Sequence, residues 1–190
     1  MKGEVDGSEK YMMQSYLTSQ LMYIGENPDR EGLKDTPARI TRSWGELYAG
    51  YEMDPKLLLR SFDAESYDQM VLLKNIEMYS MCEHHMLPFI GFASIGYVPD
   101  GKVIGISKLA RLLDIYARRL QIQERIGEQV TTFLMDELHA QGAACVISAQ
   151  HLCMRMRGVS KQNSTMVTSS MKGVFMDDSA TRMEFLTLIK

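Results

Sequence analysis

The sequence lacks any long apolar run. Its longest stretches without a formal charge, residues 84–99 and 138–154, are too short to span a membrane comfortably and are interrupted by polar residues. Residues 1–6 hold no apolar core of a signal peptide, and the last residues carry no lipidation signal. We therefore expect a cytoplasmic protein with no membrane segment.

An excess of positive charge is also missing. The 190 residues contain 21 Lys and Arg against 24 Asp and Glu, which gives a net charge of −3. This balance argues against general binding to nucleic acid or membrane surfaces, but it allows a local basic pocket for an anionic small molecule. Because repeats and linkers are absent too, residues 1–190 are expected to form one domain, with a helical N-terminal region over about 1–60 and a catalytic α+β core over about 65–190.

Cysteine and histidine are scarce and unevenly placed. Of the 3 cysteines and 4 histidines, most fall in two short segments, Cys82-Glu83-His84-His85 and His151-Leu152-Cys153. Thiolate and imidazole are ligands that zinc prefers, and cytosolic thiols stay reduced, so a metal site is favoured over a disulfide. The remaining cysteine, Cys145, lies between apolar residues and is predicted to be inert core.

Cys82 and His85, spaced i, i+3, would give a metal ion three protein ligands together with the distant Cys153. A tetrahedral ion then keeps one open position, and a water bound there has its pKa lowered to roughly 7. This arrangement is typical of a hydrolytic site. The alternative is a closed structural zinc site, in which His84 or His151 supplies the fourth ligand.

Hydrophobic periodicity and turn residues predict an α+β fold with an antiparallel sheet. Sheet edges that need protection favour an oligomer. On the strand predicted over about 143–156, His151 and Cys153 are two apart and would share a face with Ile147, Ala149, Arg155 and Arg157. The predicted elements, in order, are a helix ending near Gly25, a helix opened by the N-cap Thr36 with Pro37, strands over about 70–81 and 90–98, a hairpin turn at 99–101 leading to Val103-Ile104, a helix capped by Ser107, a helix from about Ile126 to Leu138, strands over about 143–156 and 165–174, and a helix from about Thr181.

Two helix starts carry groups that suit a nucleotide. Glu124 would be either a solvated carboxylate with a favourable dipole interaction or the acceptor of paired hydrogen bonds from a guanine-like N–H edge. Ser107, Lys108 and Arg111 mark the other start, which would be either an anion site or a capped helix with a solvated basic face. On the residues alone, both alternatives stay open.

Four segments resemble the GTP cyclohydrolase I family. They are SMCEHHMLPFIG at 80–91, IGISKLAR at 104–111, RRLQIQER at 118–125 and HLCMRMRG at 151–158. The helix start at 36–39 and the closing segment around 184–186 are similar too. The resemblance therefore covers the chain from about Met12, and several long motifs in the same order are far more specific than any one of them.

This resemblance implies the tunnelling fold, with an antiparallel sheet, helices on one face, and sheets joined across subunits into a barrel. The family is typically a homodecamer of two pentamers with active sites between subunits. It implies a zinc enzyme that converts GTP and water to 7,8-dihydroneopterin triphosphate and formate, the first committed step toward folate or tetrahydrobiopterin.

The resemblance also implies a role for each matching residue. We expect His151 to protonate N7 of the purine and His84 to assist opening of the ribose ring. The implied residues are Cys82, His85 and Cys153 for zinc, His84 and His151 for acid/base catalysis, Glu124 helped by Gln123 for guanine, Ser107, Lys108, Arg111 and Arg157 for the triphosphate, and Arg39 contributed from a neighbouring subunit.

Two other interpretations differ in class. A zinc-stabilised binding module without catalysis would have a saturated site, and loss of any ligand would unfold it. A related tunnelling-fold enzyme, such as the nitrile reductase of deazapurine biosynthesis, needs a nucleophilic cysteine and a nicotinamide cofactor. The Cys-x-x-His pair with a distal cysteine favours zinc-dependent hydrolysis instead.

Overall fold

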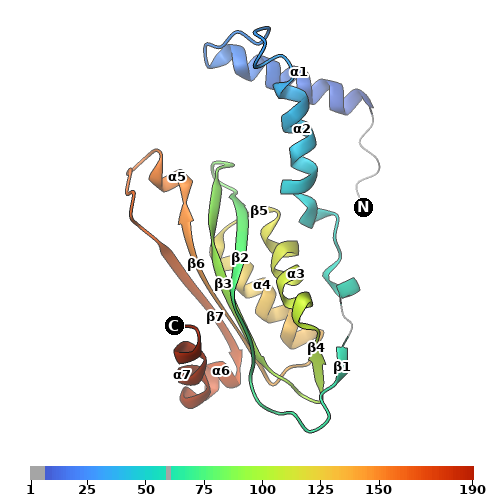
Figure 1. Cartoon of the computed structure of the whole chain (residues 1–190), viewed down its shortest axis with the longest axis vertical. Coiled ribbons are helices and arrows are strands. Elements are labelled where there is room, and N and C mark those ends of the chain that lie inside the picture. The colour runs from blue at the N-terminus through green and yellow to red at the C-terminus, as the bar shows by residue number, and fades with distance from the viewer. Residues whose placement is uncertain (1–6, 59–60) are drawn as a thin grey trace.

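A computed structural model describes residues 7–58 and 61–190 (Figure 1). The opening residues 1–6, on which the signal-peptide prediction rests, lie outside this part. No helix in the described ranges is long and apolar enough to cross a membrane. The helices are α1 (Gly7–Tyr23), α2 (Thr36–Leu47), η1 (Ala49–Tyr51), η2 (Pro55–Leu58), α3 (Ile106–Ala117), α4 (Gln123–Asp136), α5 (Leu152–Arg155), α6 (Val174–Asp177) and α7 (Ser179–Leu188). The strands are β1 (Ser61–Asp63), β2 (Val71–Cys82), β3 (Pro88–Val98), β4 (Lys102–Ile104), β5 (Leu120–Gln121), β6 (Gly142–His151) and β7 (Met166–Gly173).

A five-stranded sheet in the order β5-β2-β3-β6-β7 organises the chain. Its four long strands pair antiparallel, as predicted. The two-residue β5 instead pairs parallel to the end of β2, through Cys82 and Gln121, so the sheet is mixed. Gly91 allows β3 and β6 to approach closely, because a Cβ there would lie 2.0 Å from the carbonyl oxygen of Ser148.

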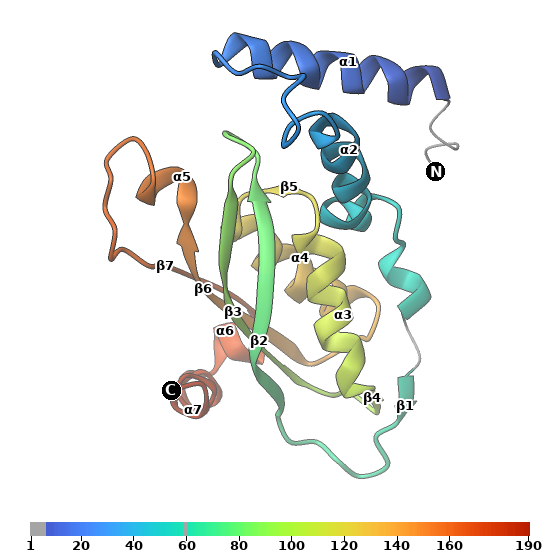
Figure 2. The same cartoon turned by 45° about the horizontal axis from the view of Figure 1, so that its top comes forward.

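Helices cover both faces of the sheet, which corrects the expectation of helices on one face (Figure 2). On one face α3 and α4 bury a large apolar core that includes Ile126 and Cys145. At one end of the other face α6 and α7 bury Phe175 and Phe185, whose rings meet edge to face at 5.5 Å, against Ala144. Successive strand residues point to opposite faces, so β6 contributes to both cores.

The turn at 99–101 reverses the chain as predicted, with Gly101 at a φ of 72°. The prediction that a hairpin follows is wrong, because β4 pairs with β1 in a separate two-stranded sheet. The Ile104 N–H donates to Tyr97 Oη at 3.0 Å, so it is not used in pairing with β3. The three-residue β1 is too short to show a hydrophobic period and was not predicted.

The strand predicted to run to 156 ends at His151, and the chain continues as the single helical turn α5. His151 pairs with Phe89, one residue after β3 begins at Pro88. Beyond this pair, β3 is too short to continue pairing with β6. The backbone groups that follow His151 are instead satisfied locally in a helical turn. His151 and Cys153 therefore do not share a strand face. The same correction applies to the other two residues placed on that face beyond the strand, Arg155 and Arg157.

Two helix starts also differ from the predictions. Helix α2 begins at Thr36 with Asp35 as its N-cap, and α3 begins at Ile106 with Gly105 as its N-cap. Neither N-cap residue makes a side-chain capping hydrogen bond. Ser107 therefore lies within the first turn of α3 and does not cap it.

Candidate active site

Cys82, His85 and Cys153 converge at the end of the sheet where β2 finishes and α5 begins (Figure 1). One ligand atom from each residue lies within 4.8 Å of the others. In a tetrahedral zinc site with bonds of 2.0–2.3 Å, neighbouring ligand atoms are about 3.5 Å apart, so small side-chain rotations would close this group. The donor set and its spacing make it a group that could bind a metal ion.

The turn between β2 and β3 keeps both of its imidazoles near the Cys82 thiol. The Met86 N–H donates to the Cys82 carbonyl at 2.8 Å, and Met86 adopts a φ of 52°, which reverses the chain tightly. Nδ1 of His84 lies 3.7 Å from Cys82 Sγ. The rings of His84 and His85 meet edge-on with centroids 6.3 Å apart. The turn thus gathers a thiol and two imidazoles in a few residues.

The three thiols differ in their surroundings. Burial raises the pKa of the Cys153 thiol, and the adjacent Cys82 thiol raises it further. A bound metal ion would favour the thiolate forms of both. Cys145 is fully buried, which raises its pKa to about 12. The prediction that Cys145 lies in the core is confirmed.

Gln123 is fully buried, and its side chain holds His151. Its Nε2 lies within 3.1 Å of the carbonyl oxygens of Ile147 and Met166 and of Thr168 Oγ1. Because the amide hydrogens are used there, Oε1 accepts a hydrogen bond from His151 Nε2 at 2.9 Å. In this structure the amide is bonded to the protein and orients His151; that Gln123 also helps Glu124 to bind guanine stays a prediction.

The His151 ring is fixed on a second side by Phe89, with ring centroids 4.5 Å apart and 3° between the planes. Burial lowers the pKa of His151, and the negative charge of Glu124 partly offsets that effect. The neutral ring is therefore favoured near neutral pH, with its hydrogen on Nε2 and with Nδ1 as the ring nitrogen not bonded to Gln123.

Glu124 lies exposed in the first turn of α4, as predicted. It borders a depression of about 470 Å³ between α4 and β7. Hydroxyl groups of β7 line this depression, and the sequence analysis did not select them, although the Thr/Ser content of that strand was the available signal. The lining residues are Glu124, Glu128, Thr168, Ser169, Ser170, Met171 and Met176.

The basic residues of α3 are not brought to the metal-binding group within one chain. Ser107, Lys108 and Arg111 lie in the first two turns of α3, beside β4 and at the far end of the sheet from α5 (Figure 1). The 12 residues of α3 rise about 1.5 Å each, so this start lies about 16 Å from the end that leads into β5. Within a single copy, Lys108 and Arg111 therefore lie far from Cys82.

The other two predicted cations lie elsewhere. Arg157 is exposed just after α5, the helix that contains Cys153. Arg39 is exposed on α2, where it forms an ion pair with Asp35 at 3.4 Å. Helix α2 packs on α1 and η1 and extends away from the sheet (Figure 2).

The family model for GTP cyclohydrolase I matches residues 13–190 of this chain. The chain belongs to the GTP cyclohydrolase I family. As a member it is an enzyme of the hydrolase class.

Relatives match over nearly the whole length. The chain is 53% identical to GTP cyclohydrolase 1 of Wolinella succinogenes, covering 96% of this chain and 98% of that protein. It is 50% identical to GTP cyclohydrolase 1 of Chlorobium chlorochromatii, covering 97% and 83%. The apo crystal structure of the archaeosine synthase QueF-Like covers 55% of this chain and 93% of that one, with a TM-score of 0.45 and 15% identity.

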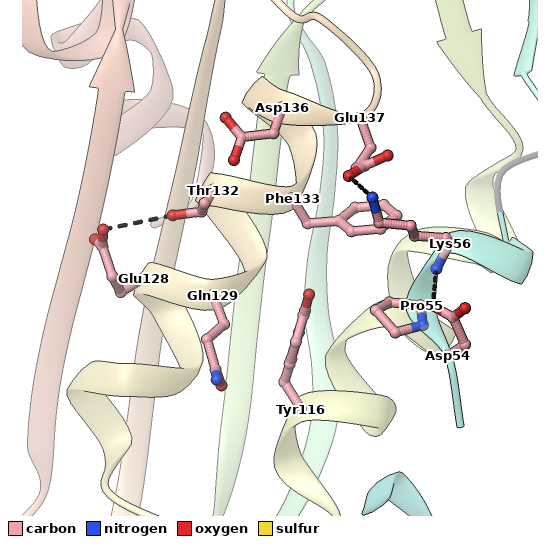
Figure 3. Close-up of a pocket in the computed structure, with 10 residues that line it drawn as sticks. All are labelled: Asp54, Pro55, Lys56, Tyr116, Glu128, Gln129, Thr132, Phe133, Asp136 and Glu137. Atoms are coloured by element: carbon pink, nitrogen blue, oxygen red, sulfur yellow. Dashed lines mark hydrogen bonds and ion pairs between the residues drawn. The ribbon is translucent and has the colours of Figure 1, made fainter. Parts of the chain in front are cut away.

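This cyclohydrolase family member has a second depression, of about 290 Å³, among η2, α3 and α4 (Figure 3). Lys56 and Glu137 form an ion pair at 2.6 Å on one side of it; Phe133 projects from α4 beside this pair, and Tyr116 rises from α3 between Gln129 and Pro55. It is centred on the second half of α4, so it is distinct from the group around Glu124.

Proposed function

We propose that this chain converts GTP and water to 7,8-dihydroneopterin triphosphate and formate, the first step toward folate or tetrahydrobiopterin. The observation that carries the proposal is the convergence of the Cys82, His85 and Cys153 ligand atoms within 4.8 Å, two residues from a half-buried, oriented His151. Family membership and relatives named GTP cyclohydrolase 1 support the same reaction.

Zinc is the metal we propose for the three-residue group. Two thiolates and one imidazole match its preferences and leave a fourth position open. When bound, zinc would supply a Lewis acid that lowers the pKa of a water at that position to about 7. The three ligands come from two separate segments, the β2–β3 turn and α5, so a bound ion would also fix these segments relative to each other.

His84 and His151 would move the protons of the reaction. We propose that His151, in its protonated form, donates from Nδ1 to N7 of the purine, because Gln123 already occupies Nε2. Protonation at N7 makes C8 electrophilic and so prepares the imidazole ring for hydrolysis. His84, beside the Cys82 thiol, would then assist the opening of the ribose ring.

Glu124 would select the base. Its exposed carboxylate can accept two parallel hydrogen bonds from N1–H and the 2-amino group of guanine, and charged acceptors make the stronger bonds of this kind. Adenine lacks that pair of donors, so the carboxylate would be left unmatched, which is a strong basis for rejection.

The triphosphate site would need a second copy of the chain. Ser107, Lys108 and Arg111 lie about one helix length from the metal group of their own chain, so we propose that they serve the site of a neighbour. Arg157 of the chain that carries the metal and Arg39 of a neighbour would add further positive charge. Backbone N–H groups at the start of α3 suit the phosphate oxygens.

An oligomer also accounts for apolar surface left open in one copy. Tyr11, Tyr16 and Tyr23 of α1 are 76%, 62% and 90% exposed, and β7 is an edge of the sheet. We propose that each chain contributes one domain, residues 1–190, to a homodecamer of two pentamers, in which edge strands of neighbours join into a barrel and α1 packs on other copies.

The decisive test is GTP turnover by zinc-loaded protein, with formate and the pterin chromophore followed together and with Cys82→Ala as the control. Both products should appear and both should be lost in the variant. Formate without pterin would indicate a divergent enzyme, and neither product from a folded, metal-loaded oligomer would refute the proposal. His151→Ala should lose formate release; release at the wild-type rate would contradict its role.

Sharing of the site between copies has its own test. Glu124→Gln and Lys108→Ala should each be inactive alone. After the two are unfolded and reassembled together at equal amounts, about a quarter of the sites would combine an intact residue from each copy and recover activity. Failure to recover any activity, with mixed oligomers present, would place both residues in one copy's site.

A further inference from the structure

An ion pair joins the turn that carries Cys82 and His85 to the helix that carries Glu124. Arg125 donates from Nη1 to Glu83 Oε2 at 2.6 Å and from Nη2 to Glu83 Oε1 at 3.2 Å. The contact is two-pronged, and this geometry fixes orientation as well as distance. Glu83 directly follows one metal-ligand candidate, and Arg125 directly follows the guanine-binding candidate.

The buried side-chain amide of Gln121 contacts the ion pair and holds it in place. The Glu83 N–H donates to the Gln121 carbonyl at 3.0 Å, and the side-chain Oε1 of Gln121 accepts from Arg125 Nη1 at 3.3 Å. Gln121 is only 1% exposed, and its Nε2 donates to the Tyr116 carbonyl and to Gln129 Oε1 at 2.9 and 2.8 Å. The guanidinium of Arg125 is thus held between an anchored amide and the carboxylate of the turn.

We propose that the Glu83–Arg125 pair is a positioning device that sets the β2–β3 turn against the start of α4. The inference rests on the proposed function, because it fixes the separation between a metal ion held by the turn and a guanine held by Glu124. Neither residue needs to contact the substrate. A displacement of the reacting groups by about 1 Å can lower the rate a hundredfold. The alignment that the ion pair sets therefore matters more than the free energy that the pair contributes to folding.

Because the ion pair is partly exposed, its effect on the alignment of the turn can be distinguished from its effect on the stability of the fold. The side chains of Arg125 and Glu83 are 42% and 32% exposed. Exposed ion pairs contribute little to folding. Loss of the pair is therefore expected to leave the fold intact while the turn becomes free to move relative to α4.

The test compares Arg125→Gln, Arg125→Lys and Glu83→Gln with the reversed pair, Glu83→Arg combined with Arg125→Glu. Lys56→Gln is the matched control, because it breaks an ion pair of the same 2.6 Å length at the other end of α4. Four quantities are measured for each protein: the Co²⁺ affinity from the thiolate–cobalt absorption, the melting temperature of the metal-free protein, and kcat and KM for GTP.

Groups that orient metal ligands from outside the site typically change affinity or activity 10–100-fold. The pair would act through the turn that holds Cys82 and His85, so the two single neutral variants should weaken Co²⁺ binding about tenfold and lower kcat at least as much. KM should change far less, and melting temperatures should match the Lys56→Gln control. For Arg125→Lys, the Co²⁺ affinity and kcat should lie between those of the wild type and of Arg125→Gln, because lysine keeps the charge but lacks the two-pronged geometry. The reversed pair should recover part of both losses.

Unchanged Co²⁺ affinity and kcat in both neutral variants would overturn the proposal. Losses that follow a lowered melting temperature would overturn it too, since they would show a general loosening of the fold. The cobalt titration needs no GTP. If the wild-type protein formed no pterin, the proposed function would fail while the titration still decided the role of the pair.

Discussion

Substituting methionine for Gln123 keeps the volume of a fully buried side chain but removes its amide. The carbonyl oxygens of Ile147 and Met166 and the Thr168 hydroxyl then lose a donor within 3.1 Å. The amide has two hydrogens to share among these three acceptors, and its oxygen accepts from His151, so three hydrogen bonds are lost. At about 1 kcal/mol net for each hydrogen bond, we expect the free energy of unfolding to fall by about 3 kcal/mol.

Urea denaturation at a fixed protein concentration measures this loss, since the apparent stability of the proposed oligomer would depend on concentration. Gln69→Met is the matched control. Gln69 is exposed and donates to the neighbouring Asp68, so its replacement should change stability by less than about 0.5 kcal/mol. A loss below about 1 kcal/mol for Gln123→Met would refute the reasoning. A raised KM for GTP at unchanged stability would support the guanine-binding role that the sequence predicts for Gln123.

The Gln123→Glu variant extends the same prediction to pH. Its carboxylate would be buried opposite two carbonyl oxygens, which disfavours the charged form and raises its pKa in the folded state above the unfolded value of about 4.3. Relative to wild type, the variant should be least destabilised below that value and should lose stability as pH rises through the folded-state pKa. Urea midpoints of both proteins across this range test it, and a pH-independent difference would contradict it.

Three further predictions concern the metal and the packing. Chelation should abolish GTP turnover and added zinc should restore it, whereas Cys153→Ser should stay inactive with zinc present. Gly91→Ala would set a Cβ 2.0 Å from the Ser148 carbonyl and should lower the melting temperature through overpacking of at least about 1–3 kcal/mol, while Gly45→Ala, with nothing within 4 Å, should be neutral or stabilising. Phe185→Ala should cost about 3–5 kcal/mol in calorimetry because its ring is fully buried, and an unchanged melting temperature would show that α7 does not dock.

The sequence predicted the long elements well because each repeats its period several times. Strands β2, β3, β6 and β7 run for 8 to 12 residues, which is enough for apolar alternation and turn residues to mark them. β1 and β5 have 3 and 2 residues, and they exist because Ser61 and Cys82 meet partners distant in sequence. Placement of α7 on the second sheet face likewise depends on Phe185 finding space above Gly96.

The candidate metal ligands could be selected from residue type alone, because cysteine and histidine are scarce outside the two segments. Their geometry could not. Cys153 reaches Cys82 from a helical turn, and that turn forms where β6 outruns β3. The role of Gln123 was also hidden, since its acceptors on Ile147 and Met166 lie 24 and 43 residues away in sequence.

Helix α3 links two proposed active sites. Its end lies near the metal group of its own chain, and its start is proposed to serve the site of a neighbour. Its buried Leu109, Leu112 and Leu113 fix it against the sheet, and its end leads into β5, which pairs beside Cys82. Its start carries the cations proposed for a neighbour's triphosphate. A core substitution such as Leu112→Ala, with an expected cost of about 2–5 kcal/mol, would therefore disturb the turn of its own chain and the phosphate contacts of the next. Rate and KM should then change together, unlike the separation expected for Arg125→Gln.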